Sequence, residues 1–470
     1  MRPRSRQLWA GLVWFLAGTL FVAVLSSFRA AATEGWSVGG GFIRDDQGRA
    51  VIFRGVNLSG GHKKKPYFDF HQAADFNRIR TDWGMNAVRF LISWAAIEPE
   101  EGRIDWDYLD QVSRRLDWAD AAGLKVILDM HQDVYGEGFA AGAGNGAPLW
   151  SCDAKHYEHF KPGNPWFLNN FKPGVLACLA GFWMHADRRA HLASLWQAVA
   201  QRLGSHPAVV GMDPFNEPLW FSPFFEHGAL SEYYQEAVTA ARLYAPSWLA
   251  FLEPSATRNA GLPTTLRKFS VGNAIYSPHS YDTDAESGKG FDLKHRDDIL
   301  NKVAHLSREA ARLGGALWIG EYGGMSARPH IAEYMEAQND AAGAVAAGSM
   351  YWDYARLPDP YAMLHEDGTE IEPLMQVLVR PYAERVAGTP LWYRYDGATR
   401  TFTLRYRPDP ALRSPLVFSV PGRIYPEGFD VLCSGRCWVE AHGNETWVAP
   451  PLAIIQSGVD QTITLRPKAL

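Results

Sequence analysis

The sequence predicts a (β/α)8 barrel followed by a C-terminal antiparallel β-sandwich. Three observations lead to this fold class: eight short apolar runs recur along the chain, amphipathic segments separate most of them, and the pattern changes after about residue 388. A near-continuous apolar run is typical of a parallel strand that is buried on both faces. Strands that alternate with helices build parallel sheets, and eight such units close into a barrel.

The barrel strands are expected in chain order at residues 51–57, 86–93, 124–130, 209–215, 247–253, 273–279, 317–323 and 349–354. Apolar residues recur at helical spacing between them. These patterns predict helices at 107–123, 189–204 and 297–315. The fifth crossover, at 255–268, is a weak helix, and the interval between the third and fourth strands is unusually long.

The ends of the chain predict further elements. A hairpin at 41–55, with Asp-Gln-Gly in its turn, is expected to close the barrel floor. After about residue 388, short alternating strands broken by Gly, Pro and Asp predict the sandwich. We therefore expect an N-terminal segment at 1–35, a catalytic barrel at 36–387 and a sandwich at 388–470.

Composition narrows the class of function. The chain is 47% hydrophobic and 21% charged, as expected for a globular protein with a sizeable core. Its net charge of −5 leaves no basic footprint, so nucleic acid is not an expected partner.

The N-terminal segment has the order of an export signal. Arg2, Arg4 and Arg6 precede an apolar run at 8–25, and small residues follow it. The length of the run lies between that of a signal core and that of a membrane span, so the segment is either cleaved or retained as an anchor. In both cases we expect an exported chain that is secreted, periplasmic or membrane-anchored.

The four cysteines fit an oxidising compartment. Cys433 and Cys437 could close a short loop, and Cys152 and Cys178 could staple the long insertion. None lies in a Cys-x-x-Cys motif, which favours disulfides over metal ligation. Four unpaired thiols are the alternative.

Polar residues gather where the predicted strands end. Active sites of such barrels lie at the C-terminal ends of the strands. The residues at these ends are Asn57, Asp129, His131, Asp133, Asn216, Glu217, His279, Tyr281, Glu321, Tyr322, Trp352 and Asp353, and Arg89 lies within the second strand. Any one of them could be a structural polar residue with buried partners. Their gathering at one rim indicates a site.

Two of these residues, Glu217 and Glu321, follow apolar runs that end the fourth and seventh strands. Retaining glycoside hydrolysis needs two carboxylates about 5 Å apart, one protonated and one ionised. Apolar surroundings would keep the first neutral, and Arg89 with nearby hydroxyl donors would keep the second charged. Asn216 could hydrogen-bond a sugar 2-hydroxyl.

The motifs "AVRF", "FNEP", "PHSY", "GEYGG" and "YWDY" resemble those of glycoside hydrolase family 5 over residues 40–385. "LDMHQDVYG" followed by "GNGAPLW", and "RGVNLSGGHKKKPY", resemble the endoglycoceramidases within that family. This resemblance implies a C-terminal β-sandwich and cleavage between the glycan and ceramide of glycosphingolipids.

The resemblance also implies residue roles. Glu217 would be the acid/base and Glu321 the nucleophile. Arg89 and His279 would support the nucleophile. Contacts to the sugar would come from His131, Asp133, Asn216, Tyr281 and Trp352. One lysine of the run Lys63, Lys64 and Lys65 would reach sugar hydroxyls, and we assign Lys65 to this role and the other two to solvent.

Two features depart from the family pattern. Pro214 is expected to distort the fourth strand just before Glu217. The insertion at 136–184 has no match over most of its length.

An apolar aglycone would need apolar loops at the site mouth. One candidate loop contains Leu219, Trp220, Phe221, Phe224 and Phe225. A second cluster, in the insertion, contains Trp150, Trp166, Phe167, Phe182 and Trp183. The alternative is that these side chains pack against one another over the barrel.

The expected function is therefore that of a retaining glycoside hydrolase that acts on glycosphingolipids by double displacement, with no cofactor and no metal. A glycolipid substrate and a membrane surface are the expected partners. One alternative is a β-glucosidase, β-glucanase or steryl-glucosidase of the same family. Another is an inactive carbohydrate- or lipid-binding barrel, against which the retention of both glutamates argues. A metal hydrolase is disfavoured because His131 and Asp133 lack a third ligand nearby in sequence.

Overall fold

The computed structural model describes residues 35–468. The expected export segment lies outside the described residues, apart from Gly35. At the centre is a closed barrel of parallel strands, in which β9 and β10 together fill the sixth of eight positions. The strands are β4 (Arg54–Leu58), β5 (Ala87–Ile92), β6 (Lys125–Met130), β7 (Val209–Asp213), β8 (Leu249–Leu252), β9 (Ala274–Tyr276), β10 (His279–Ser280), β11 (Ala316–Tyr322) and β12 (Gly348–Tyr351). The barrel prediction is confirmed.

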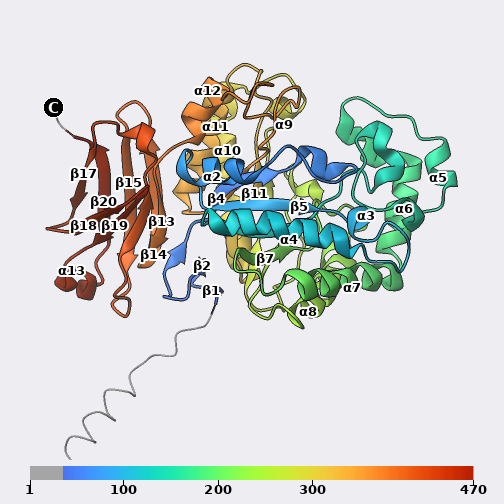
Figure 1. The fold of residues 1–470 in the computed structure, drawn as a ribbon, viewed down its shortest axis with the longest axis horizontal. Helices are drawn as coiled ribbons and strands as arrows, with labels where there is room; N and C mark the ends of the chain where they lie inside the picture. The colour runs from blue at the N-terminus through green and yellow to red at the C-terminus, as the bar shows by residue number, and fades with distance from the viewer. Residues whose placement is uncertain (1–34, 469–470) are drawn as a thin grey trace, which may run out of the picture.

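Helices cover the outside of the barrel (Figure 1). They are α2 (Ala73–Thr81), α4 (Trp106–Ala121), α7 (Ala186–Leu203), α8 (Ser231–Arg242), α10 (Arg296–Leu313), α11 (Ile331–Ala344) and α12 (Glu372–Leu378). α4 begins where the sequence predicts, because the Asp105 carboxylate accepts the Tyr108 N–H at 2.9 Å and caps the first turn.

The fifth crossover contains only η6 (Ala256–Arg258), a short 3-10 turn, so an extended strap takes the place of the fifth barrel helix. Arg258 Nε lies 2.9 Å from Glu309 Oε2 on α10, and this buried ion pair fixes the strap to the barrel. The weak helical pattern at 255–268 therefore corresponds to a segment that is not helical beyond this short turn.

The hairpin of β2 (Phe42–Arg44) and β3 (Ala50–Val51), preceded by β1 (Ser37–Gly39), closes the barrel floor. Its Ile43 and Val51 are buried against the first residues of barrel strands, among them Ala87 and Val210. β3 also pairs with β13 (Tyr382–Val386), so the hairpin extends a sheet of the sandwich. The sequence did not predict this second role.

The sandwich consists of two antiparallel sheets. One has the order β1-β2-β3-β13-β16-β19-β18, and the other β14-β15-β20-β17. Its first strand, β13, begins at Tyr382, before the expected boundary at residue 388. The remaining strands are β14 (Gly388–Asp396), β15 (Thr401–Pro408), β16 (Leu416–Ser419), β17 (Phe429–Cys433), β18 (Trp438–His442), β19 (Glu445–Ala449) and β20 (Gln461–Pro467), with α13 (Leu452–Ser457) before β20.

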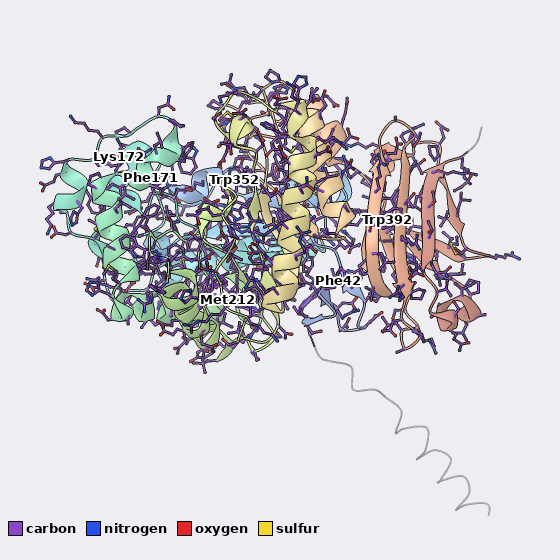
Figure 2. All side chains as sticks on the ribbon, turned by 180° about the vertical axis from the view of Figure 1, so that it is seen from behind. Phe42, Phe171, Lys172, Met212, Trp352 and Trp392 are labelled. Carbon is purple, nitrogen blue, oxygen red and sulfur yellow. A yellow bond between two sulfur atoms is a disulfide. The ribbon has the colours of Figure 1, made fainter. Side chains whose placement is uncertain are left out.

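The sandwich packs directly against the barrel (Figures 1 and 2). The Tyr393 hydroxyl on β14 donates to the Ala347 carbonyl at 2.6 Å. A Cβ at Gly343 in α11 would come 2.3 Å from the Tyr393 carbonyl oxygen, so glycine permits the close approach. The sandwich is therefore a fixed support of the barrel.

The insertion after β6 forms a lobe at the end of the molecule opposite the sandwich (Figure 1). It contains η2 (Glu137–Gly142), η3 (Leu149–Ser151), α5 (Lys155–Glu158), η4 (Trp166–Phe171) and α6 (Pro173–Trp183). A disulfide joins Cys152 to Cys178 across this lobe, and a second joins Cys433 to Cys437 in the sandwich. Within residues 35–468, every helix is too short or too polar to cross a membrane.

Candidate active site

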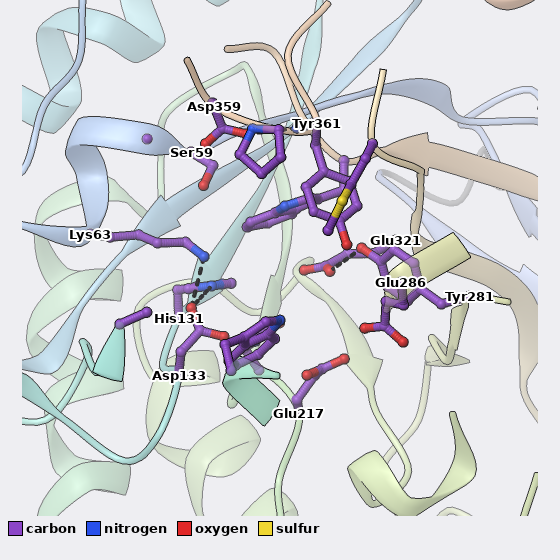
Figure 3. A pocket seen from close by; sticks show the side chains of 17 residues that line it. Ser59, Lys63, His131, Asp133, Glu217, Tyr281, Glu286, Glu321, Asp359 and Tyr361 are labelled. Carbon is purple, nitrogen blue, oxygen red and sulfur yellow. Dashed lines mark hydrogen bonds and ion pairs between the residues drawn. The ribbon is translucent and has the colours of Figure 1, made fainter. Parts of the chain in front are cut away.

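A cavity of about 280 Å³ opens at the C-terminal ends of the barrel strands (Figure 3). Glu217 and Glu321 face each other across it. Other residues that line it are Ser59, Lys63, His131, Asp133, Trp166, Asn216, Tyr281, Glu286, Met325, Trp352, Asp359 and Tyr361. The predicted gathering of polar strand-end residues thus forms one cavity.

Glu217 follows β7 in an unusual backbone conformation. Its φ is +43°, in the left-handed region that non-glycine residues rarely adopt. β7 ends at Asp213, and Pro214 donates no N–H to a continued ladder, so the chain turns here and carries Glu217 over the cavity. Its N–H is bound by the Glu253 carboxylate at 2.8 Å, which offsets part of the strain.

Glu321 lies within β11 and is held by two donors. Arg89 Nη1 donates to Oε1 at 2.7 Å, and the Tyr281 hydroxyl donates to Oε2 at 2.8 Å. Both bonds stabilise the charged carboxylate. Burial nevertheless raises the pKa of Glu321 above its ordinary value, against the lowering effects of His279 and Arg89.

Glu217 is held by different donors. His279 Nδ1 lies 2.8 Å from Glu217 Oε1, and Asn259 Nδ2 donates to the same oxygen at 2.7 Å. Burial raises the pKa of Glu217, but the hydrogen bond and charge of His279, together with the hydrogen bond from Asn259, outweigh it and hold the pKa below its ordinary value. Its side chain is 21% exposed, whereas that of Glu321 is 6% exposed.

His279 bridges the two glutamates. Its Nδ1 lies 3.4 Å from Glu321 Oε2, and its Nε2 lies 3.2 Å from Glu253 Oε1. Burial lowers the pKa of His279, but Glu253, Glu321 and Glu217 outweigh it and raise the pKa well above its ordinary value. The imidazole is therefore a cation between carboxylates.

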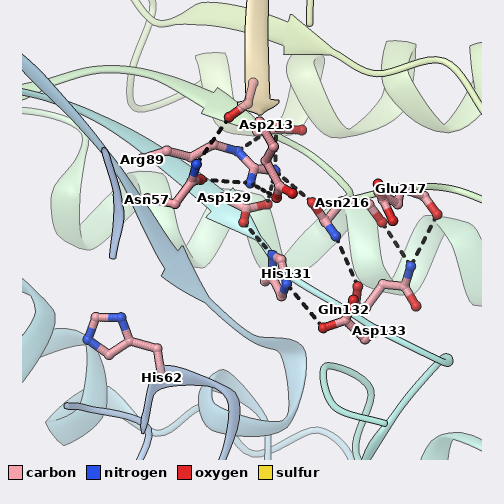
Figure 4. Close-up of polar contacts among 12 residues, drawn as sticks. Asn57, His62, Arg89, Asp129, His131, Gln132, Asp133, Asp213, Asn216 and Glu217 are labelled. Carbon is pink, nitrogen blue, oxygen red and sulfur yellow. Dashed lines mark hydrogen bonds and ion pairs between the residues drawn. The ribbon is translucent and has the colours of Figure 1, made fainter. Parts of the chain in front are cut away.

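Arg89 is fully buried beneath the cavity (Figure 4). Its guanidinium contacts Glu321, Glu253, Asp213 and Asp129 at 2.7 to 3.0 Å. Burial and the neighbouring Glu253 raise the pKa of Asp213 well above its ordinary value, against the lowering effect of Arg89. One guanidinium thus fixes the back of the site.

A second group lies on the opposite side of the cavity. Lys63 Nζ donates to Asp133 Oδ2 at 2.7 Å and lies 4.3 Å from the centroid of the Trp352 ring. His131 stacks on Trp352 at 5.3 Å and contacts the Asp129 carboxylate at 2.7 Å through Nδ1. An aromatic face rimmed by a cation and a carboxylate suits a sugar ring and its hydroxyls.

The assignment of Lys65 to this site is wrong, and Lys63 takes its place. The turn η1 (Gly60–Lys63) directs Lys63 into the cavity. Lys64 and Lys65 follow the turn and are exposed. Three consecutive lysines carry no periodic signal that could separate them.

Asn216 lines the cavity, and its side chain is already engaged. Its Oδ1 accepts from Arg89 Nη2 at 2.9 Å, and its Nδ2 donates to the Gln132 carbonyl at 3.1 Å. The second Nδ2 hydrogen can still serve a ligand.

Three residues that contact Glu217 or line the cavity were not predicted from the sequence: Glu253, Asn259 and Glu286. Glu253 follows β8 just as other site residues follow their strands, so the same signal could have found it. Asn259 comes from the irregular strap, which has no such signal. Glu286 is a further carboxyl group that lines the cavity, and burial together with Glu217 raises its pKa to about 7.

The aromatic side chains divide between core and surface. Phe182, Trp183, Leu219 and Phe225 are buried, so for them the packing alternative holds. Phe221 and Phe224 are 48% and 68% exposed on the loop after Glu217. Phe221 stacks on the exposed Phe171 of the insertion at 5.4 Å, and η4, which ends at Phe171, begins with the cavity residue Trp166. An exposed aromatic pair therefore lies on two segments that each also line the cavity.

Glu217, His279 and Glu321 each offer one possible ligand atom within 4.8 Å of the others. This spacing could hold a metal ion. The spacing also fits the separation of about 5 Å that retaining glycoside hydrolases have between their carboxyl groups.

The fold and this carboxylate pair define a retaining glycoside hydrolase. A model of the cellulase family, glycosyl hydrolase family 5, matches residues 44–356, and a model of the glycoside hydrolase family 5 C-terminal domain matches residues 380–453. The chain belongs to glycoside hydrolase family 5.

Two relatives illustrate the similarity. The structure of endo-glycoceramidase II from Rhodococcus sp. is 32% identical, with a TM-score of 0.80, and the match covers 91% of this chain and 100% of that one. That protein has also been solved as a lactosyl-enzyme intermediate and as a ganglioside GM3 complex. Endoglycoceramidase I of Rhodococcus hoagii is 27% identical over 435 residues, which cover 86% of this chain and 83% of the relative.

Proposed function

We propose that this glycoside hydrolase cleaves the β-glycosidic bond between the glycan and the ceramide, or a related lipid aglycone, of glycosphingolipids. The observation that carries the proposal is the stacked, exposed pair Phe171 and Phe221, which lies on the two segments that also carry the cavity residues Trp166 and Glu217. The likeness to endoglycoceramidases supports the same substrate class.

The reaction proceeds by double displacement. The Glu321 carboxylate attacks the anomeric carbon, the glycosidic bond breaks, and the leaving oxygen takes the proton of Glu217. Water then attacks the glycosyl–enzyme ester, Glu217 takes a proton from this water, and Glu321 leaves as a carboxylate. Arg89 and Tyr281 stabilise the carboxylate of Glu321 before attack and after release.

Substrate binding is expected to bring the proton to Glu217. In this structure the pKa of Glu321 is raised and that of Glu217 is lowered, which is the reverse of what the first step needs. A sugar seated between them removes water from Glu217, whose side chain is the more exposed of the two. Loss of solvation raises the pKa of a carboxyl group, whereas Glu321 keeps its bonds to Arg89 and Tyr281.

The glycone is expected to lie over Trp352, with its hydroxyls bound by Lys63, Asp133 and His131. The lipid would leave the cavity past Glu217 and lie on Phe171 and Phe221. We propose on the same grounds that the enzyme works at a membrane surface, because exposed aromatic side chains of this kind favour an interface. Export from the cytoplasm, which the two disulfides support, would bring it to such surfaces.

To test this proposal, the purified protein is incubated with lactosylceramide, glucosylceramide or cello-oligosaccharides in separate assays. Release of intact lactose from lactosylceramide is the expected result. Hydrolysis of cello-oligosaccharides alone would replace the lipid assignment with a β-glucanase, and binding of all three without hydrolysis would contradict catalysis.

Phe171→Ser with Phe221→Ser provides the matched test of the lipid surface. This double variant should lose activity on lactosylceramide in vesicles and keep its activity on a soluble aryl lactoside. Equal loss on both substrates would show that the two rings serve the fold and not the aglycone.

A further inference from the structure

Glu253 is a buried carboxylate that the mechanism above does not use. It follows the last residue of β8 and is 2% exposed. Burial of a carboxylate is costly unless hydrogen bonds and charges compensate for it. The groups around Glu253 are the backbone N–H of Glu217 and the side chains of Arg89 and His279, which also contact Glu321 or Glu217.

The first contact is to the backbone of Glu217. Glu253 Oε2 accepts the Glu217 N–H at 2.8 Å. This bond is made at the residue with φ of +43°, where the chain needs an external partner to keep a strained conformation. Glu253 therefore fixes the direction in which the Glu217 side chain leaves the backbone.

The second oxygen faces two cations. Glu253 Oε1 accepts from Arg89 Nη2 at 2.9 Å and lies 3.2 Å from His279 Nε2. The other ring nitrogen, Nδ1, lies 2.8 Å from Glu217 Oε1. Carboxylate oxygens thus lie beside both nitrogens of His279, and this surrounding negative charge favours the imidazolium over the neutral ring.

We propose that Glu253 is a positioning residue for hydrolysis: it holds the backbone of Glu217 and keeps His279 as a cation between Glu217 and Glu321. The inference rests on the proposed roles of those two glutamates.

The groups that face His279 come from several elements. Glu217 follows β7, Glu253 follows β8, Glu321 lies on β11, and Tyr281 follows β10 with its ring 6.4 Å away. Arg89 on β5 contacts both Glu253 and Glu321 from below. Glu217 and Glu321 therefore remain beside His279 when Glu253 is neutralised. The pKa of His279 should then fall, but it should stay above that of a buried histidine with no carboxylate nearby.

Two substitutions separate the two actions of Glu253. Glu253→Gln keeps an oxygen for the Glu217 N–H and removes the charge. Glu253→Asp keeps the negative charge, but its side chain is shorter by one methylene group, so the carboxylate moves away from the Glu217 N–H. Glu309→Gln is the control, because Glu309 is also buried and ion-paired, at 2.9 Å from Arg258 Nε, and lies outside the cavity.

The readout is the ring ¹⁵N resonance of His279 in the full chain, assigned by its loss in His279→Gln and followed across pH. In Glu253→Gln the pKa of His279 should fall by about 1–2 units, the usual effect of removing an adjacent opposite charge. Glu309→Gln should leave this titration where it is in the wild type. In Glu253→Asp, kcat on an aryl lactoside should fall at least about tenfold with KM nearly unchanged, because a misplaced acid impairs the transition state alone.

An unchanged His279 titration in Glu253→Gln would overturn the inference, as would full kcat in Glu253→Asp. If Glu253→Gln fails to fold, a smaller fall of the His279 pKa in Glu253→Asp supports the inference and an unmoved titration refutes it. A wild type without glycosidase activity would defeat the proposed function, while the His279 titration would still decide the role of Glu253.

Discussion

Replacing Tyr281 by Phe tests how the structure holds Glu321 ready for attack. The substitution removes one oxygen and keeps the ring, so the hydrogen bond of 2.8 Å from the hydroxyl to Glu321 Oε2 is the contact that is lost. Arg89 still holds Oε1 at 2.7 Å. The change should therefore act on the charge of Glu321 and leave its position almost unaltered.

The size of the effect follows from the kind of bond. A hydrogen bond to a charged group contributes about 1.5–3 kcal/mol, and 1.4 kcal/mol corresponds to a factor of about ten. We expect kcat/KM on an aryl lactoside to fall roughly 10–150-fold. Because the lost bond stabilised the charged form, the pKa of Glu321 should rise by about 1–2 units, and the acid limb of the kcat/KM profile should move to higher pH by the same amount.

The assay is the pH dependence of kcat/KM for wild type, Tyr281→Phe and Tyr276→Phe. Tyr276 makes the same kind of bond, from its hydroxyl to Glu309 Oε2 at 2.8 Å, away from the cavity. Its loss should lower stability and leave the acid limb in place. A Tyr281→Phe enzyme within about twofold of wild type, with an unmoved acid limb, would refute the reasoning, because that bond could then not stabilise the carboxylate.

Three further predictions follow from other parts of the molecule. Lys63→Met should raise KM for lactosides roughly tenfold, since the partner of Asp133 is lost, whereas the same change at the exposed Lys65 should leave KM unaltered. Reduction of Cys152–Cys178, or its replacement by serines, opens a loop with a separation of 26 residues and should lower the free energy of unfolding by about 3 kcal/mol; an unchanged urea midpoint would contradict this. Burial lowers the pKa of His62 to about 3, so between pH 6.5 and 3 the unfolded chain binds more protons than the folded one, and the free energy of unfolding should fall as the pH drops below 6.5. The loss from this residue should be about 2 kcal/mol at pH 5. In His62→Leu, the free energy of unfolding measured in urea should depend less on pH over this range.

The barrel and most of its site could be predicted because each strand is an apolar run that ends in a polar residue. Glu217 and Glu321 were found in this way. Glu253 carries the same signal, because it is the last residue of the predicted fifth strand at 247–253. Asn259 could not be found, since the strap that carries it has neither helical nor strand period.

Other features depend on contacts between distant parts of the chain. Pairing of Val51 on β3 with Arg385 on β13 joins the hairpin to the sandwich, and strand alternation carries no information on which strands pair. The inward direction of Lys63 depends on a single 3-10 turn. Trp183 at the end of α6 is buried, whereas Phe221 in the loop after Glu217 is exposed, a difference that composition alone does not determine.

The central claim is that Glu321 forms a covalent bond to the sugar while Glu217 delivers and recovers a proton. The most direct measurement is to incubate the enzyme with an activated 2-deoxy-2-fluoro-β-lactoside, which is slow to leave the ester, and to map the labelled peptide by mass spectrometry. We predict one lactosyl label on Glu321, formed also in Glu217→Ala when the leaving group needs no proton, and absent in Glu321→Gln. A label on another residue, or turnover with inversion at the anomeric carbon and no label, would contradict the account.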